Sequence, residues 1–228
     1  MTENGIRSTE KLKRKILRLS ALVEEQARRC VLSVRTRDRQ AAQHVIDADA
    51  EIDALEISIE KDCIAMLETG GPAYVDIRFA IGVLKINVDL ERIGDLAANI
   101  GRSVLSLGRH EQLVLPGELT QMSERMVRML TATLDALVHM DTEGAREVCG
   151  MDADVDTLNR AMYAVVRDRI QENPAQTERL LHLLGISRAM ERIADYATNI
   201  AENVVFMQEG IIIRHGGEPP TPDNAESR

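Results

Sequence analysis

The chain has 228 residues, of which 44% are hydrophobic and only 2% aromatic, and its formal net charge is −9. A core without tryptophan must be built from aliphatic and methionine side chains, which suits helix-on-helix packing better than a sheet. The negative charge argues against nucleic acid as the main partner, because phosphate binding requires a basic surface.

Six helices are predicted between a few Pro and Gly breaks. They cover residues 8–39, 43–68, 73–108, 117–140, 142–172 and 175–209. None contains the run of about 20 apolar residues that a membrane span requires, and the charged N-terminus lacks the apolar region of a secretory signal. We therefore expect a cytoplasmic protein without a transmembrane segment.

The third and sixth predicted helices carry the same apolar seam, 100 positions apart. Its spacing alternates between four and three residues, which is typical of helices that pack along a core. The seam is Ile86, Leu90, Ile93, Ala97, Ile100, Val104 and Leu107 in the third helix, and Ile186, Met190, Ile193, Ala197, Ile200, Val204 and Met207 in the sixth. The second and fifth helices repeat one another at an offset near 103. The sequence thus predicts an all-α fold: a tandem repeat of two three-helix bundles with pseudo-two-fold symmetry.

Pro116 and Gly117 mark the division between the repeats. The predicted units are residues 1–113, residues 114–213 and a disordered tail at 214–228, whose composition is polar and rich in Pro and Gly. The three cysteines form no CxxC motif and lie in apolar helical segments, so we expect free, buried thiols in a reducing compartment. These cysteines are Cys30, Cys63 and Cys149.

Each half carries two pairs of acidic residues spaced four apart, which places both carboxylates of a pair on one helix face. A single pair is expected by chance in so acidic a chain, and the informative feature is the recurrence in register. The pairs are Asp49 with Asp53, Glu91 with Asp95, Asp152 with Asp156, and Glu191 with Asp195. At about 100° per residue, the pairs on the third and sixth helices point away from the seam. We expect them to form outer surface patches.

Clustered carboxylates repel one another unless a cation or a basic side chain neutralises them. Hard cations such as Mg²⁺, Mn²⁺ or Ca²⁺ suit such oxygen ligands, and iron suits them in a multinuclear site. Asn99 and Asn199 extend the rows as candidate neutral ligands. The alternative is a solvated face paired with arginines, for which Arg92, Arg102 and Arg192 are candidates.

The sequence offers little support for an enzyme. A ferritin-like di-iron oxidase places ExxH motifs inside its bundle, and this chain has no ExxH. It also lacks a GxxxxGK[ST] phosphate loop and a GxSxG nucleophile motif. We therefore expect a non-enzymatic protein.

Two segments of the chain resemble the signature segments of the PhoU family. These are "DLERIGDLAANI" and "MERIADYATNIAENVVFMQEGIIIRH", and "PAYVDIRFAIGVLKINVDLERIGD" resembles the family segment that leads into the first of them. The resemblance implies a cytoplasmic negative regulator of phosphate uptake and phosphate-starvation signalling. It further implies a Pst-type phosphate transporter, contacted through its ATPase subunit, and a sensor histidine kinase as partners, and a homodimer.

The resemblance also implies multinuclear metal sites on the four acidic rows, holding Fe, Mn, Mg or Zn. One departure bears on the ligands: the family commonly has histidine after the motif aspartate, where this chain has Leu96 and Tyr196. A metal site here should therefore consist almost entirely of oxygen ligands. The remaining alternative is a metal-independent helical adaptor that docks a basic partner on its acidic faces.

Overall fold

The computed structural model describes residues 3–68, 74–107 and 114–213. In these ranges the chain forms helices and contains no strand. The elements are α1 (Glu3–Thr36), α2 (Arg39–Glu68), α3 (Tyr74–Leu107), α4 (Gly117–His139), α5 (Thr142–Cys149), α6 (Asp152–Glu172), the short 3-10 helix η1 (Pro174–Gln176) and α7 (Thr177–Glu209). None of the helices in these ranges combines the length and the apolarity that crossing a bilayer requires.

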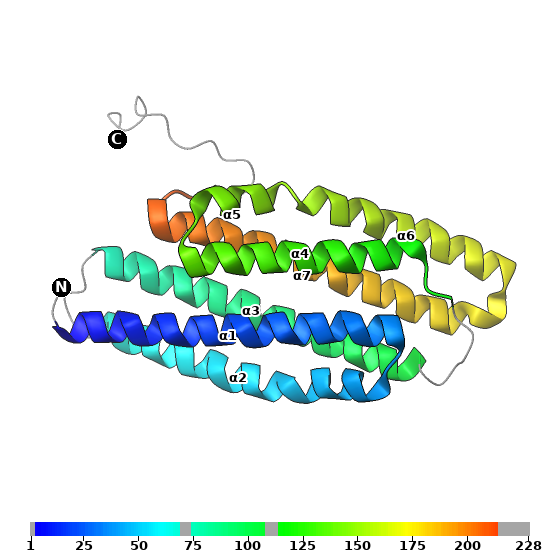
Figure 1. The fold of residues 1–228 in the computed structure, drawn as a ribbon, viewed down its shortest axis with the longest axis horizontal. Coiled ribbons are helices and arrows are strands. Elements are labelled where there is room, and N and C mark those ends of the chain that lie inside the picture. The colour runs from blue at the N-terminus through cyan, green and yellow to red at the C-terminus, as the bar shows by residue number, and fades with distance from the viewer. Residues whose placement is uncertain (1–2, 69–73, 108–113, 214–228) are drawn as a thin grey trace, which may run out of the picture.

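The helices form two three-helix bundles placed side by side (Figure 1). One bundle consists of α1, α2 and α3, and the other consists of α4, the pair α5 and α6, and α7. The bundles meet mainly through α3 and α7, and to a smaller extent through α1 and α4. The predicted all-α tandem repeat with pseudo-two-fold symmetry is confirmed.

The seam residues of α3 and α7 lie in the core, as predicted. Every member of both seams is at most 6% exposed. The small residues beside the seam allow close packing: a Cβ atom on Gly101 would lie 3.0 Å from the backbone oxygen of Ala42, and one on Gly94 would lie 3.2 Å from Ile52 side-chain atoms. Their counterparts Ala194 and Ala201 are fully buried. These positions therefore serve helix packing.

The predicted helix over residues 142–172 is interrupted, and this prediction was wrong. The backbone N–H groups of Gly150 and Met151 donate to carbonyls three residues earlier, those of Glu147 and Val148, at 3.0 and 2.9 Å. Such bonds tighten the last turn of a helix and end it. As a result α6 starts afresh at Asp152, which places this predicted site residue in the first turn of a helix.

The first helix also ends earlier than predicted, at Thr36. Arg37 adopts a left-handed conformation with φ 55°, and the Asp38 carboxylate accepts hydrogen bonds from the N–H groups of Gln40 and Ala41. Asp38 thereby caps the start of α2.

The cysteines are free thiols, but they differ in burial. Cys30 and Cys63 are buried as predicted, whereas Cys149 is half-buried at the end of α5, so the prediction was wrong for Cys149. Burial is the main cause that raises the pKa of the Cys63 thiol to about 11. The thiol of Cys63 is therefore protonated at neutral pH.

Candidate metal sites

The first acidic patch lies on neighbouring helices of the first bundle. We define it as Asp49 and Asp53 of α2 with Glu91 and Asp95 of α3. Partial burial is the main reason that the pKa of Glu91 lies above its usual range, and repulsion from Asp95 and Asp53 raises it further. The pKa of Asp49 is raised in the same way, by partial burial and then by Asp53 and Asp95. The four carboxylates therefore act on one another across the two helices.

Arginines partly neutralise this first patch. Arg92 Nε lies 3.6 Å from Glu91 Oε2, and Arg92 Nη1 lies 3.9 Å from Asp95 Oδ2. Arg102 lowers the pKa of Asp49 and donates a 2.6 Å hydrogen bond to Asn99 Oδ1. Arg92 and Arg102 thus partly neutralise the acidic side chains, as the solvated-face alternative predicts. The Asn99 side-chain oxygen already accepts a hydrogen bond from Arg102.

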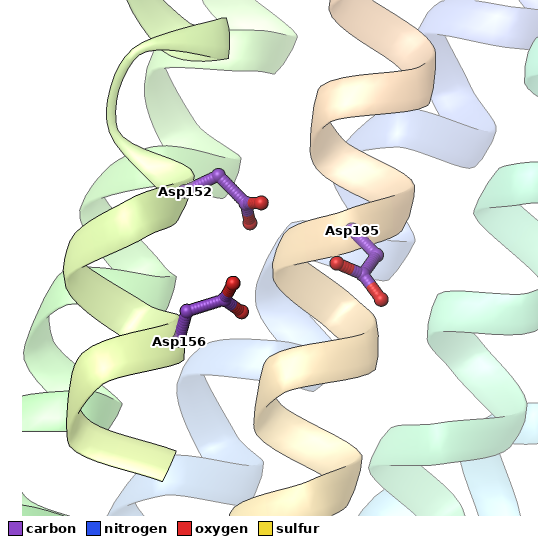
Figure 2. A group of neighbouring side chains, drawn as sticks. All are labelled: Asp152, Asp156 and Asp195. Atoms are coloured by element: carbon purple, nitrogen blue, oxygen red, sulfur yellow. The ribbon is translucent and has the colours of Figure 1, made fainter. Parts of the chain in front are cut away.

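The second acidic patch, which consists of Asp152, Asp156, Glu191 and Asp195, is drawn together more tightly. One carboxylate oxygen from each of Asp152, Asp156 and Asp195 lies within 4.8 Å of the others. Figure 2 shows Asp152 and Asp156 pointing from one helix toward Asp195 on the next. In the part of the chain that the structure describes, this is the one group of three or more His, Cys, Asp or Glu side chains that meets this spacing.

Crowding of the carboxylates raises pKa values in the second patch. Partial burial, followed by repulsion from Glu191 and Asp156, raises the pKa of Asp195 to about 6, although Arg192 opposes the shift. The Asp195 residue as a whole is exposed, so solvent screens part of this effect. Burial and then the two aspartates of α6 also raise the pKa of Glu191. Glu191 is therefore part of this patch electrostatically, although it lies outside the group of three.

Both patches contain a buried oxygen whose hydrogen-bonding capacity is unused. Asp49 Oδ1 and Asp152 Oδ1 are buried and have no partner with hydrogen-bond geometry among the described residues, although the Gln26 side chain beside Asp49 lowers the pKa of that carboxyl. These aspartates occupy matched positions in the two halves. Burial of an unpaired carboxylate oxygen is unfavourable, and a bound cation would satisfy it.

The geometry of the second patch suits a hard cation. Ca²⁺ binds oxygen at 2.3–2.6 Å and Mg²⁺ at 2.0–2.1 Å, so two oxygens on opposite sides of one ion lie roughly 4–5 Å apart. The 4.8 Å limit on the three aspartates falls in that range. Small rotations of these side chains would thus suffice to form a site of three or four carboxylates.

The structure gives no support to nitrogen ligands after the motif aspartates. Leu96 is buried and Tyr196 is half-buried, and neither provides an imidazole. In the second half the backbone carbonyl of Asn199 accepts a hydrogen bond from the Asn203 side chain. The oxygen character that the sequence suggested for both patches is retained.

Two residues near the first patch were not predicted from the sequence. Glu56 of α2 contributes to the raised pKa of Glu91, and Gln26 of α1 is a buried amide whose Oε1 has no partner among the described residues. Glu56 follows Asp53 by three residues, so helical spacing alone would have found it. Its counterpart in the second half is Asn159, so Glu56 does not belong to the repeated acidic rows.

Known proteins resemble this chain along most of its length. The sequence model of the PhoU domain matches residues 16–104 and 119–204. A "phosphate-specific transport system accessory protein PhoU homolog" from Caulobacter vibrioides is 32% identical over 92% of this chain and 94% of its own. A homolog with the same description from Pseudomonas aeruginosa is 30% identical over 91% of this chain and 86% of its own.

Solved structures agree with the fold. The crystal structure of PhoU from Pseudomonas aeruginosa superposes with a TM-score of 0.87 at 29% identity, covering 90% of this chain and 99% of that one. The "phosphate transport system regulatory protein PhoU" from Streptococcus pneumoniae gives a TM-score of 0.81 at 28% identity, covering 91% and 98%. Sequence and fold thus point to the same family.

Proposed function

The chain belongs to the PhoU family, and from this membership we propose that it is a cytoplasmic negative regulator of phosphate uptake and phosphate-starvation signalling. Its relatives are described as accessory proteins of the phosphate-specific transport system. We propose that it acts through the ATPase subunit of a Pst-type transporter and a sensor histidine kinase. The role is regulatory rather than enzymatic.

The regulatory proposal is tested by deleting the gene. We expect the deletion strain to produce alkaline phosphatase in high phosphate, because the starvation response would no longer be restrained. The intact gene supplied in trans should restore repression. Unchanged alkaline phosphatase output in high phosphate would contradict the proposal.

We further propose that both acidic patches bind divalent or trivalent metal ions, with Fe, Mn, Mg and Zn as the candidates. The proposal rests above all on the convergence of Asp152, Asp156 and Asp195 within 4.8 Å. A bound ion would supply positive charge that removes the repulsion among the carboxylates. The proposed ligands are Asp49, Asp53, Glu91 and Asp95 in the first patch, and Asp152, Asp156, Glu191 and Asp195 in the second.

Metal content tests this second proposal directly. Protein purified without chelators and supplied with Fe, Mn, Mg and Zn should contain metal by elemental analysis. Asp195→Asn should lower the metal content and keep the fold, because it removes charge at nearly constant size. Asp168→Asn is the matched control, since Asp168 lies on α6 outside the patch and pairs with Arg167.

A metal-independent adaptor that docks a basic partner is the second candidate function. The observation that favours it is the pairing of Arg92 with Glu91 and Asp95, because arginines can replace a cation in the first patch. Protein that contains no metal and shows no shift in melting temperature with added metal would support this candidate.

The domain division and the oligomeric state are part of the same proposal. We propose that the functional units are the repeats 1–113 and 114–213, followed by the tail 214–228, and that two chains form a homodimer. The tail and the boundary residue 113 lie outside the described residues. Sedimentation equilibrium of the full chain measures the oligomeric state.

A further inference from the structure

A row of exposed aliphatic side chains lies on the outer face of α2 and α3. Neighbouring members on each helix are spaced by three or seven residues, so they share one side of their helix. They are Ile57 (48% exposed), Ile64 (46%) and Leu67 (36%) on α2, and Ile81 (37%) and Val88 (47%) on α3. We name these five residues the α2/α3 trough.

The surface between the two rows is hollowed. A cavity of about 460 Å³ is lined by Glu56 and Glu60 from α2 and by Leu84, Lys85, Asn87, Val88 and Asp89 from α3, so Val88 is the one trough residue in its lining. Consecutive helices of the bundle run antiparallel (Figure 1). Ile64, four residues after Glu60 on α2, and Ile81, three residues before Leu84 on α3, therefore each lie one helical turn beyond the cavity in the same direction. The eleven residues from Ile57 to Leu67 span about 15 Å, which is the length of roughly three helical turns.

The second half shows that the fold does not require an apolar side chain at three of these five positions, whereas the counterparts of Leu67 and Ile81 are the apolar Ile170 and Leu181. At offsets of 103 and 100, three trough positions are matched by exposed arginines in the same scaffold. The pairs are Ile57 with Arg160, Ile64 with Arg167, and Val88 with Arg188. Charged side chains are therefore compatible with this helix face, and three clustered aliphatic residues there are unfavourable in water unless something covers them.

The charges around the trough indicate what covers it. Glu56 and Glu60 lie four residues apart on the α2 bank, and Asp53 extends the row toward the first patch. Burial, then Glu60, then Asp53 raise the pKa of Glu56. Asn87 is fully buried below and donates 3.1 and 3.2 Å hydrogen bonds to the Glu56 backbone oxygen and Oε1. Asp89 and Lys85 also line the cavity, and exposed Lys61 lies between Ile57 and Ile64 on the same face of α2. Acids outnumber bases in the cavity lining by three to one, so a complementary ligand is apolar on one side and basic along its edge.

We propose that the α2/α3 trough binds a basic amphipathic helix of a partner protein, about three turns long. Apolar side chains of that helix lie between Ile64 and Ile81, and its lysines or arginines face Glu56 and Glu60. An amphipathic helix in an apolar groove is a common recognition mode. The inference adds the chemistry of a partner to the proposed regulatory function, and it requires no metal.

The test uses the full chain in EDTA and two fluorescein-labelled 14-residue peptides. Both peptides carry leucine with helical spacing, and their remaining positions are lysine in one and glutamate in the other. By fluorescence polarisation we expect the lysine peptide to bind at least ~10-fold tighter than the glutamate peptide. The double variant Ile57→Arg/Ile64→Arg should weaken binding at least ~10-fold, and Glu60→Gln should weaken it about threefold.

The matched control carries the same added charge elsewhere. Val138→Arg/Leu181→Arg changes two exposed aliphatic residues, at 49% and 53% exposure, far from the trough. This variant should bind as the wild type does, apart from the small loss caused by two added positive charges. Circular dichroism and melting temperature identify any variant that fails to fold, and Ile57→Arg alone then replaces the double variant.

Three outcomes would overturn the proposal. The first is equal binding of the two peptides, and the second is an equal loss of binding in the trough variant and its control. The third is a wild-type dimer that becomes monomeric in Ile57→Arg/Ile64→Arg by sedimentation, which would make a second copy of this chain the occupant. None of these results depends on metal content or on alkaline phosphatase output, so the proposals fail separately.

Discussion

Asp195 shows what clustered carboxylates do to a single residue. Its pKa is raised to about 6, first by partial burial and then by Glu191 and Asp156. At neutral pH the residue is nevertheless charged, and the folded protein is destabilised by holding that charge among others. A cation in the patch would reverse this effect.

The pH dependence of metal-free protein follows from this shift. In the unfolded chain Asp195 titrates near pH 3.9, so between about pH 4 and 6 the folded state binds more protons. The contribution of Asp195 to stability is therefore full below about pH 4, falls as pH rises to 6 and is constant above. Because Asp195 is exposed as a residue, solvent screening reduces the effect to about 1 kcal/mol.

Asp195→Asn should remove this pH-dependent loss. In EDTA we expect the variant to be about 1 kcal/mol more stable than the wild type at pH 7.5 and nearly equal to it at pH 4. Urea denaturation at both pH values measures the difference. An Asp195→Asn variant that is less stable than the wild type at pH 7.5 would contradict this expectation, because it would show that the Asp195 charge is already neutralised in the metal-free wild type.

The positions of the site residues could be predicted because the acids recur in register. Their mutual distances could not be predicted, since they depend on how α6 packs against α7 and on where α6 begins. The buried oxygens of Asp49 and Asp152 also required the tertiary structure. Glu56 lacks an acidic counterpart and was missed for that reason.

At the scale of the helices, the apolar register predicts where a helix exists, but local signals decide where it begins, ends or is interrupted. The segment 142–172 keeps its apolar spacing through Met151 and Val155, although the helix is interrupted at Gly150. Local capping by Asp38 and Asp141, whose carboxylates bind backbone N–H groups, gave boundaries that periodicity alone does not locate. Helix existence was therefore predictable, whereas continuity was not.

Two glycines in helix interiors should respond oppositely to alanine. At Gly185 of α7, an added Cβ would have no atom within 4 Å, so Gly185→Ala should stabilise the protein by about 1 kcal/mol through helix propensity. A Cβ on Gly101 would lie 3.0 Å from the Ala42 backbone oxygen. Gly101→Ala should therefore destabilise by about 1 kcal/mol, because overpacking exceeds the propensity gain.

Thermal or urea unfolding of both glycine variants tests this contrast. The same substitution on two helices controls for propensity, so the difference between the variants reports the α2/α3 packing. Equal stability of Gly101→Ala and Gly185→Ala would contradict the prediction, because it would mean that α2 can move away from α3 to make room for the added Cβ.

At the scale of the whole molecule, the repeat predicted the fold class but not the contact between the halves. That contact depends on residue pairs that the hydrophobic periodicity of the sequence does not mark. Gly82 leaves room for Met207, since a Cβ there would lie 2.1 Å from Met207 Cγ. Lys85 lies over the Phe206 ring, 4.8 Å from its centroid. Only the three-dimensional structure brings such residues together.

The shared α3/α7 contact predicts that neither half is stable alone. A fragment of residues 1–113 would expose the face of α3 that packs on α7, and we expect it to show reduced helicity and to associate. Mixing it with residues 114–228 should restore the helical signal in a one-to-one complex. Circular dichroism with analytical ultracentrifugation measures both, and a monomeric, fully helical 1–113 fragment would contradict the expectation.

The tandem repeat has a consequence for how this protein can diverge. In a symmetric dimer of three-helix chains, every substitution appears twice, once on each side of the axis. Fusing the two copies into one gene removes that constraint, so each half can mutate by itself. The isoleucine at position 57 and the arginine at position 160 are such a divergence. The corresponding surfaces of the two halves thus differ, while the paired acids of both halves stand in the same register.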